Sequence, residues 1–238
     1  MSDRGLSEGA RFVREWRRNA AHLAEHGLYD PAQEHDACGV GFVAAIDGQP
    51  RRQVVALAID ALRAVWHRGA VDADGKTGDG AGIYIEIPQD FFREQIRGAK
   101  DAKGKIAVGM VFLPRNDFTG QERCRTIVET EILRFGYSIL GWRQVPVDTS
   151  VIGEKAIATR PEIEQIVIGN PADASDDEFE RELFLIRRRI ERRVLEEHIN
   201  DFYICSLSCR SVIYKGLFLA EQLSTFYPDL QDERFVSS

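Results

Sequence analysis

The chain has 238 residues, of which 44% are hydrophobic and 29% charged, a composition typical of a globular protein with one main core. Its formal net charge of -7, with both signs mixed along the chain, argues against the clustered basic face of a nucleic-acid-binding protein. No uncharged apolar stretch approaches the roughly 20 residues that cross a bilayer, and the few cysteines do not suit a disulfide scaffold, so we expect a cytoplasmic protein with reduced thiols and no membrane contact.

The first 37 residues differ from the rest of the chain. After a polar start, apolar residues recur at helical spacing from 10 to 27, and Gly27 and Pro31 close the segment. Periodicity alone favours an ordinary first helix that packs on the core. A leader that precedes the folded domain is the alternative.

The next region predicts a strand, a helix, a loop and a second strand. Small and apolar residues over 40–46 lead to an Asp-Gly turn pair, which predicts a buried strand that begins just after Cys38. Residues 52–66 are apolar on nearly every side, as in a helix that packs against a sheet. A glycine-rich loop follows over 69–82. Alternation over 83–87 then predicts a half-buried strand.

The remaining chain mixes strands and helices, which indicates an α+β fold. We expect a long amphipathic helix over 176–199, whose Arg and Glu residues form a solvated face with i,i+4 ion pairs rather than a partner-binding surface. Its core-facing residues are predicted to be Phe179, Leu183, Leu185, Ile186, Ile190, Val194 and Leu195. The other predicted elements are strands at 105–113, 137–147, 162–168, 202–208 and 211–215 and helices at 120–135 and 220–226.

Cys38 is the first candidate for chemistry. Gly39 and Gly41 follow it, and such small neighbours leave a sulfur approachable and backbone N–H groups free to bind an anion. A single cysteine in an apolar strand is more often an inert core residue. The residues alone leave both readings open.

A second candidate is the loop that contains His67-Arg68-Gly69-Ala70 and Thr77-Gly78-Asp79-Gly80-Ala81-Gly82. Its glycines allow close backbone approach to a ligand or to a neighbouring segment. Phosphate binding fits poorly, because a Walker-type loop needs Lys-Ser or Lys-Thr at the start of a helix, whereas a strand follows here.

The other cysteines are weaker candidates for a functional role than Cys38. Cys205 and Cys209 lie four residues apart and would face the same side of a strand, so a metal pair is conceivable. Nothing nearby completes four ligands, and buried structural cysteines are the favoured reading. A thiol redox protein ranks last, because the chain has no Cys-x-x-Cys motif.

Three motifs in order carry a resemblance: residues 38–44, 67–70 and 77–82. Their sequences and separations closely resemble the start of the class II glutamine amidotransferase domain of glutamate synthase. The resemblance covers most of the chain from Cys38 and continues at residues 87–88, 91–92, 202–208 and 214–216. It implies the four-layer α/β/β/α sandwich of N-terminal-nucleophile hydrolases, here incomplete at the C-terminus.

The resemblance also implies an organisation and a mechanism. Residues 1–37 would be a propeptide, cleaved between Ala37 and Cys38, and 38–238 part of the amidotransferase domain. The freed α-amino group, with a pKa of about 8, would take the thiol proton of Cys38. The thiolate would attack L-glutamine, release ammonia and leave a thioester that water hydrolyses to glutamate.

By the same resemblance, Arg68, Gly69 and Asp79 would form the substrate pocket, with Arg68 otherwise a structural ion-pair partner. In the family the chain continues into an Arg-Phe-Ser-Thr-Asn motif and an Asn-Gly pair that supplies the oxyanion hole. Both are missing here, so we expect the chain alone to lack full activity, since loss of an oxyanion donor costs about 100-fold to 1000-fold in turnover.

No metal or cofactor is expected in this stretch. FMN and an iron–sulfur cluster, like the transfer of ammonia to 2-oxoglutarate, would belong to the remainder of the synthase chain. That remainder, and an NADPH-oxidising small subunit, are the implied partners beside L-glutamine. The alternative function is a truncated, non-catalytic remnant that acts in protein association.

Overall fold

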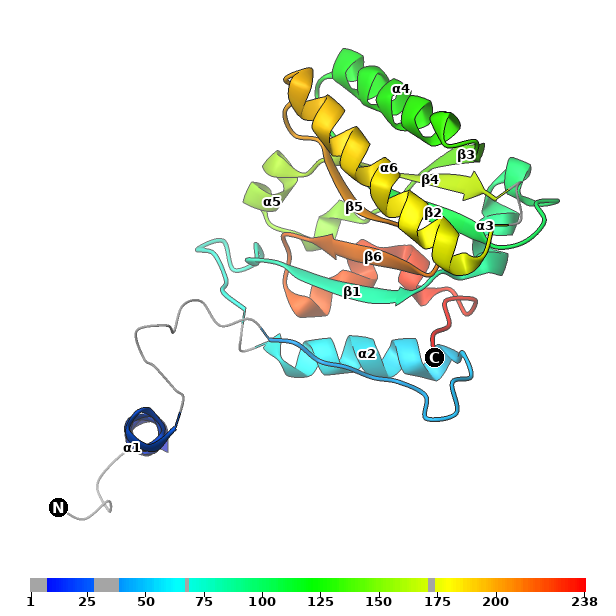
Figure 1. Ribbon diagram of the computed structural model, residues 1–238. Helices are drawn as coiled ribbons and strands as arrows, with labels where there is room; N and C mark the ends of the chain where they lie inside the picture. The colour runs from blue at the N-terminus through cyan, green and yellow to red at the C-terminus, as the bar shows by residue number, and fades with distance from the viewer. Residues whose placement is uncertain (1–7, 28–38, 67–68, 171–173) are drawn as a thin grey trace. The chain divides into compact units, whose positions relative to one another are not determined.

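The computed structural model describes residues 8–27, 39–66, 69–170 and 174–238 (Figure 1). The chain divides into two compact units, residues 1–38 and residues 39–238. In the first unit, α1 (Glu8–His26) confirms the helix expected from the spacing of apolar residues. None of the helices in the described ranges is long and apolar enough to span a membrane.

The second unit contains two antiparallel sheets. The larger has four strands in the order β3-β4-β2-β5, and the smaller pairs β1 with β6. Alternation along β1 is visible in its burial, because Ile83 and Ile85 are buried while Tyr84 between them is 69% exposed. The bounds are β1 (Ala81–Glu86), β2 (Ile106–Leu113), β3 (Ser138–Gln144), β4 (Glu162–Gly169), β5 (Tyr203–Ser208) and β6 (Ser211–Gly216). All six strands were expected from the sequence.

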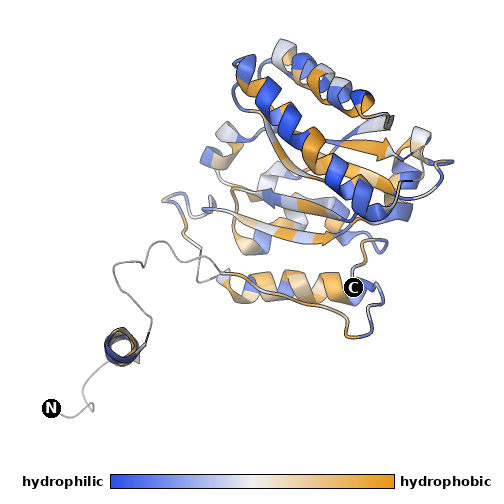
Figure 2. Ribbon diagram, viewed as in Figure 1, coloured by the Kyte–Doolittle hydropathy of each residue, from blue (hydrophilic) through white to orange (hydrophobic). Residues whose placement is uncertain are grey.

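Helices and sheets of this unit lie in layers (Figure 1). The helices α4 (Phe118–Arg134) and α6 (Asp176–Glu196) cover one face of the four-stranded sheet and share a hydrophobic core with it. A second core lies between the two sheets and includes residues of α2 (Arg52–Ala64). Figure 2 shows α2 mostly in the colours of hydrophobic residues, as expected for a helix that packs on a sheet. The mixed α+β class with antiparallel sheets is thus confirmed.

The long helix α6 begins with a capping box. The Ser175 side chain accepts from the Glu178 backbone N–H, and the Glu178 carboxylate accepts from the Ser175 backbone N–H. Its charged face carries the expected i,i+4 pairs, such as Arg192 Nε to Glu196 Oε1 at 2.8 Å. The prediction that Leu185 and Leu195 face the core was wrong: they are 46% and 75% exposed, because each lies one position beside the buried stripe.

Several short helices were not predicted, because segments of three to seven residues are too short to show a periodicity. The α-helices among them are α3 (Gln89–Gln95) and α5 (Glu154–Thr159). The expected helix over 220–226 is a 3₁₀ turn (Ala220–Gln222) followed by α7 (Leu223–Phe226). Further 3₁₀ turns are Arg97–Ala99, Thr149–Val151 and Pro228–Gln231.

The prediction of a buried strand over 40–46 was wrong. Residues 40–45 have no regular secondary structure and lead into a turn at 46–47, which the Gly48 N–H closes by donating to the Ala45 carbonyl at 3.0 Å; the segment pairs with no strand within the described ranges. Val40 and Phe42 are each 89% exposed, and Ile46 is fully exposed. The alternate residues Val43 and Ala45 are partly covered. An apolar sequence alone cannot form a strand, since a ladder needs a partner whose position no local pattern specifies.

Candidate functional site

Two of the four predicted site residues are described, and they lie together. A Cβ atom added to Gly69 would be 3.3 Å from Asp79 Oδ1. The loop that joins them folds back on itself: Val71 and Gly78 form an antiparallel bridge, and the Asp79 N–H donates to the Ala70 carbonyl at 3.2 Å. The other two residues, Cys38 and Arg68, lie outside the described residues.

Asp74 organises the tip of this loop. Its carboxylate accepts hydrogen bonds from the Lys76 N–H at 2.9 Å, the Thr77 N–H at 2.7 Å and the Thr77 hydroxyl at 2.5 Å. These donors, with the Thr77 side chain first, lower the pKa of Asp74 to about 2. Nearby, Asp72 forms an ion pair with Lys155. The loop therefore has a defined conformation that rests on its own side chains.

The glycines of the loop allow it to approach another backbone closely. A Cβ on Gly78 would lie 2.6 Å from the Phe218 carbonyl carbon and oxygen, and one on Gly82 would lie 3.0 Å from the Tyr214 carbonyl oxygen and 2.7 Å from Lys215 Cβ. Only glycine fits at such distances. Gly82 belongs to β1, in agreement with the reading that disfavoured a phosphate loop. At these two positions the glycine serves packing against β6 and the residues after it.

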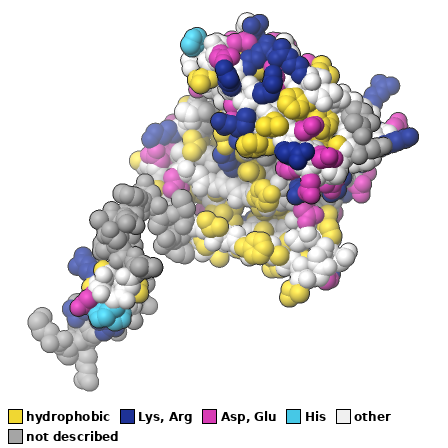
Figure 3. Space-filling model, viewed as in Figure 1, with side chains coloured by type: hydrophobic (Ala, Val, Ile, Leu, Met, Phe, Trp, Pro, Cys, Tyr) yellow, Lys and Arg dark blue, Asp and Glu magenta, His cyan; other side chains and the backbone are white. Residues whose placement is uncertain are grey.

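A groove lies beside the segment that directly follows Cys38. It encloses about 470 Å³ and is lined by residues 39–43, parts of α2 and β1, and Ser237 and Ser238. Gly41 faces α2 here, since its Cβ position lies 3.7 Å from Ala61 Cβ. Hydrophobic side chains gather on this side of the molecule, along the lower edge of the view in Figure 3. The groove is thus an apolar, open depression within residues 39–238.

The remaining cysteines, Cys124, Cys205 and Cys209, are all buried free thiols. Burial raises the pKa of Cys124 and Cys205 to about 11, and burial together with the Glu180 carboxylate raises that of Cys209 to about 12. These three thiols therefore stay protonated near neutral pH, and a protonated thiol is a poor nucleophile.

The expected common orientation of Cys205 and Cys209 was wrong. Cys205 belongs to the core between the sheets, whereas Cys209 belongs to the core beneath α6, because β5 ends at Ser208. The prediction that both are buried structural cysteines is confirmed, since both side chains are buried. Within the described ranges, no group of three or more His, Cys, Asp or Glu side chains is placed to hold a metal ion.

Sequence reasoning missed the partners of the glycine loop. The β6 strand and Phe218 lie more than 130 residues along the chain from Gly78, and such a separation leaves no local pattern. The available signal was indirect: glycines clustered before a strand indicate a close backbone contact, without saying with which segment.

The amino-acid sequence of the chain is similar to proteins of one known family. Residues 38–238 match the family model described as "Glutamine amidotransferases class-II". The chain is 64% identical over 234 residues to the "Glutamate synthase [NADPH] large chain" of Azospirillum brasilense, a match that covers 98% of this chain and 15% of the relative. It is 39% identical over 214 residues to the protein of the same name from Bacillus subtilis, covering 89% of this chain and 14% of that protein. A ferredoxin-dependent glutamate synthase of Arabidopsis thaliana is 40% identical over 215 residues, covering 88% and 13%. The chain thus spans about one seventh of the length of these relatives.

Proposed function

The chain belongs to the class II glutamine amidotransferases and corresponds to the N-terminal region of glutamate synthase large chains. From this membership we propose that its residues hydrolyse L-glutamine to glutamate and ammonia, with Cys38 as the nucleophile. The single observation that carries the proposal is the family match, which begins at Cys38 itself and runs to residue 238.

The chemistry needs residues 1–37 to be removed by cleavage of the Ala37–Cys38 bond. The α-amino group then released on Cys38 takes the proton of its own thiol, which the amide nitrogen of an uncut chain cannot do. The thiolate attacks the side-chain amide carbon of glutamine. Ammonia leaves with the proton from the α-amino group, and a thioester forms. Water then cleaves the thioester, which gives glutamate and restores the thiol.

The loop around Gly69 and Asp79 is proposed to form the wall of the substrate pocket, with Arg68 beside it. The closeness of the Asp79 carboxylate to Gly69, with Oδ1 3.3 Å from the Gly69 Cβ position, supports this role, since an exposed carboxylate can bind the α-amino group of an amino acid. The adjacent loop conformation is fixed by Asp74. A prearranged wall lowers the entropy lost when substrate binds.

We further propose the four-layer sandwich of N-terminal-nucleophile hydrolases. The order of layers supports it: α4 and α6, the four-stranded sheet, the two-stranded sheet, then α2 (Figure 1). The exposed apolar segment 40–46 adds support, because a segment that is apolar on both faces is stable as a strand only inside a larger sheet. In this proposal the segment pairs with strands that the described ranges do not contain.

The ammonia is proposed to pass to 2-oxoglutarate in the remainder of a synthase, with an NADPH-oxidising subunit as a further partner. FMN and iron–sulfur chemistry belong to that remainder in the proposal. The three buried cysteines do not suit a cluster, because their thiols lie in two separate cores and stay protonated.

The test is a glutaminase assay on this chain joined to the remaining part of the Azospirillum brasilense relative. We expect glutamine hydrolysis that disappears in Cys38→Ala and falls strongly in Arg68→Ala. A Cys124→Ala variant serves as the control and should keep its activity. Hydrolysis that survives Cys38→Ala would refute the mechanism, and a folded but inactive parent would favour the alternative role in protein association.

A further inference from the structure

Arg115 and Arg160 both line a second cleft, whose residues lie far along the chain from the groove at residues 39–43. The cleft encloses about 660 Å³ and is lined by residues 112–117, 158–161 and 201–203. Arg115 lies after β2, and Arg160 lies directly after α5. The cleft shares no lining residue with the groove at residues 39–43, so it does not depend on the proposed glutaminase site.

Among the described residues, no carboxylate forms an ion pair with Arg160, although the charge of Glu162 acts on it more weakly than burial and Arg115 do. The Arg160 Nε is buried and has no hydrogen-bond partner, the one such side-chain atom among the described residues. Burial, and next the positive charge of Arg115, lower the pKa of the Arg160 guanidinium. An uncompensated buried charge is costly. The arrangement therefore favours a ligand that brings negative charge.

The carboxylates near the cleft are occupied elsewhere or do not pair with these arginines. Asp117 accepts from the Gly120 N–H at 2.9 Å and caps α4, and Glu162 accepts from the Gln144 side chain. Asp201 also lines the cleft. Within the described ranges neither Arg115 nor Arg160 forms an ion pair. Both guanidinium groups thus keep free N–H donors.

The position of Arg115 is fixed before any ligand binds. The buried Gln121 side chain donates to the Pro114 carbonyl at 2.7 Å and to the Arg115 carbonyl at 3.2 Å. Arg115 Nη1 donates to the Ile157 carbonyl at 2.6 Å, which links the loop to α5. One of its five donors is used in this way, and the others remain for a ligand.

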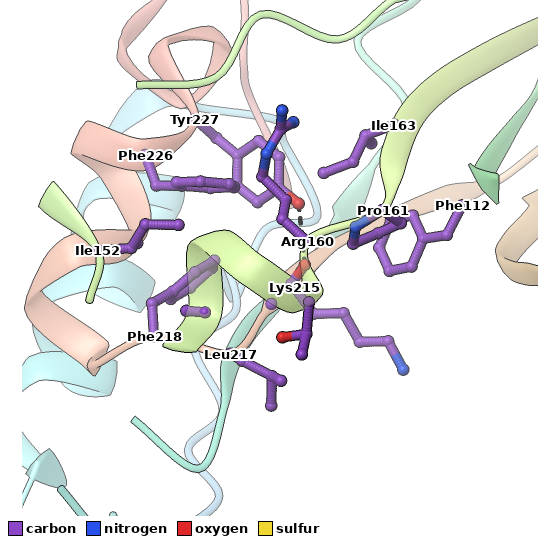
Figure 4. A pocket seen from close by; sticks show the side chains of 13 residues that line it. Phe112, Ile152, Arg160, Pro161, Ile163, Lys215, Leu217, Phe218, Phe226 and Tyr227 are labelled. Carbon is purple, nitrogen blue, oxygen red and sulfur yellow. Dashed lines mark hydrogen bonds between the residues drawn. The ribbon is translucent and has the colours of Figure 1, made fainter. Parts of the chain in front are cut away.

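We propose that this cleft binds a small organic oxyanion, a carboxylate or a phosphate, through Arg115 and Arg160. Guanidinium groups bind both kinds of oxyanion with paired hydrogen bonds. Phe112 and Pro161 offer an apolar wall for the rest of the ligand. Figure 4 shows a neighbouring pocket that shares Phe112, Arg160 and Pro161 with the cleft; in that pocket the Arg160 side chain extends beside the Tyr227 ring. The enclosed volume matches that of small-molecule pockets.

The test is titration calorimetry with succinate and, separately, inorganic phosphate, at constant ionic strength. Sodium chloride is the control for general salt effects, and the NMR signal of the Arg160 Nε–H reports binding directly. We expect one of the two oxyanions to bind and to shift that signal. Preference between the probes identifies the ligand as carboxylate or phosphate.

In Arg160→Gln the affinity should fall about tenfold or more, since charged hydrogen bonds are lost. Arg160→Lys should give an intermediate value, because it keeps the charge but not the paired donors. Arg192→Gln, in the exposed pair on α6, should bind as the parent does. If Arg160→Gln does not fold, Arg115→Lys replaces it. The proposal would be overturned if neither probe binds, or if sodium chloride gives the same heat of binding and the same shift of the Arg160 Nε–H signal as the probes. Unchanged affinity in folded Arg160 variants would overturn it as well.

Discussion

Gly78→Ala tests whether the glycine-rich loop is built for packing. The added methyl carbon would lie 2.6 Å from two backbone atoms of Phe218 and 2.8 Å from the Leu219 nitrogen. Backbone atoms cannot move aside as a flexible side chain can. We therefore expect a loss of about 1–3 kcal/mol in the free energy of unfolding, the usual cost of overpacking. For a unit of about 200 residues this lowers Tm by roughly 2–12 °C.

Gly41→Ala is the matched control, because its added Cβ meets only Ala61 Cβ at 3.7 Å, an ordinary contact distance. Thermal and urea unfolding of both variants, followed by circular dichroism, measures the difference. We expect Gly41→Ala to stay within about 0.5 kcal/mol of the parent. A Gly78→Ala variant as stable as Gly41→Ala would show that the close contact with Phe218 is absent, and the packing role of the loop would then be wrong.

Three further predictions concern other groups. A glutamine-like electrophile at neutral pH should label Cys38 and spare the three buried cysteines, whose thiols have a pKa of about 11 or 12; mass spectrometry of tryptic peptides checks this, and equal labelling of all four would contradict it. The Asp74 carboxyl should titrate near pH 2 by NMR, and its midpoint should be higher in Thr77→Val. Its contribution to stability is present above its ordinary pKa of 3.8 and is lost as pH falls through about 2, and a midpoint near 3.8 in the parent would argue against the loop geometry. Asp229→Ala should cost about 3–5 kcal/mol, because it leaves the buried Arg143 unpaired, whereas Arg192→Ala should cost less than about 1 kcal/mol; similar values in urea unfolding would contradict the burial of the first pair.

Sequence patterns predicted the elements that a single helix or strand can specify by itself. The α6 helix has a clear apolar stripe and a capping box, and β1 alternates strictly, so both lie where they were expected. The prediction of a strand over 40–46 was wrong for the opposite reason. Its composition suits a buried strand, but burial depends on partners that residues near it in sequence do not supply.

The candidate site divides in the same way. The sequence motif indicated that Gly69 and Asp79 share a loop, and the structure places the Asp79 carboxylate 3.3 Å from the position of a Cβ on Gly69. It did not indicate that Gly78 packs against Phe218, because that contact joins distant segments. The cleft lined by Arg115 and Arg160 could not be predicted either, since two isolated arginines 45 positions apart form no motif. Each becomes notable only when the absence of a carboxylate partner in the described ranges is known.

The central claim is that Cys38 becomes an N-terminal nucleophile, and intact mass with N-terminal sequencing tests it most directly. The chain is expressed alone and joined to the remaining part of the Azospirillum brasilense relative, then purified without protease. The joined protein should begin at Cys38 and, after treatment with a glutamine-like electrophile, carry a single adduct on that residue. A protein that keeps Met1 or Ser2 in both forms, and yet hydrolyses glutamine, would contradict it.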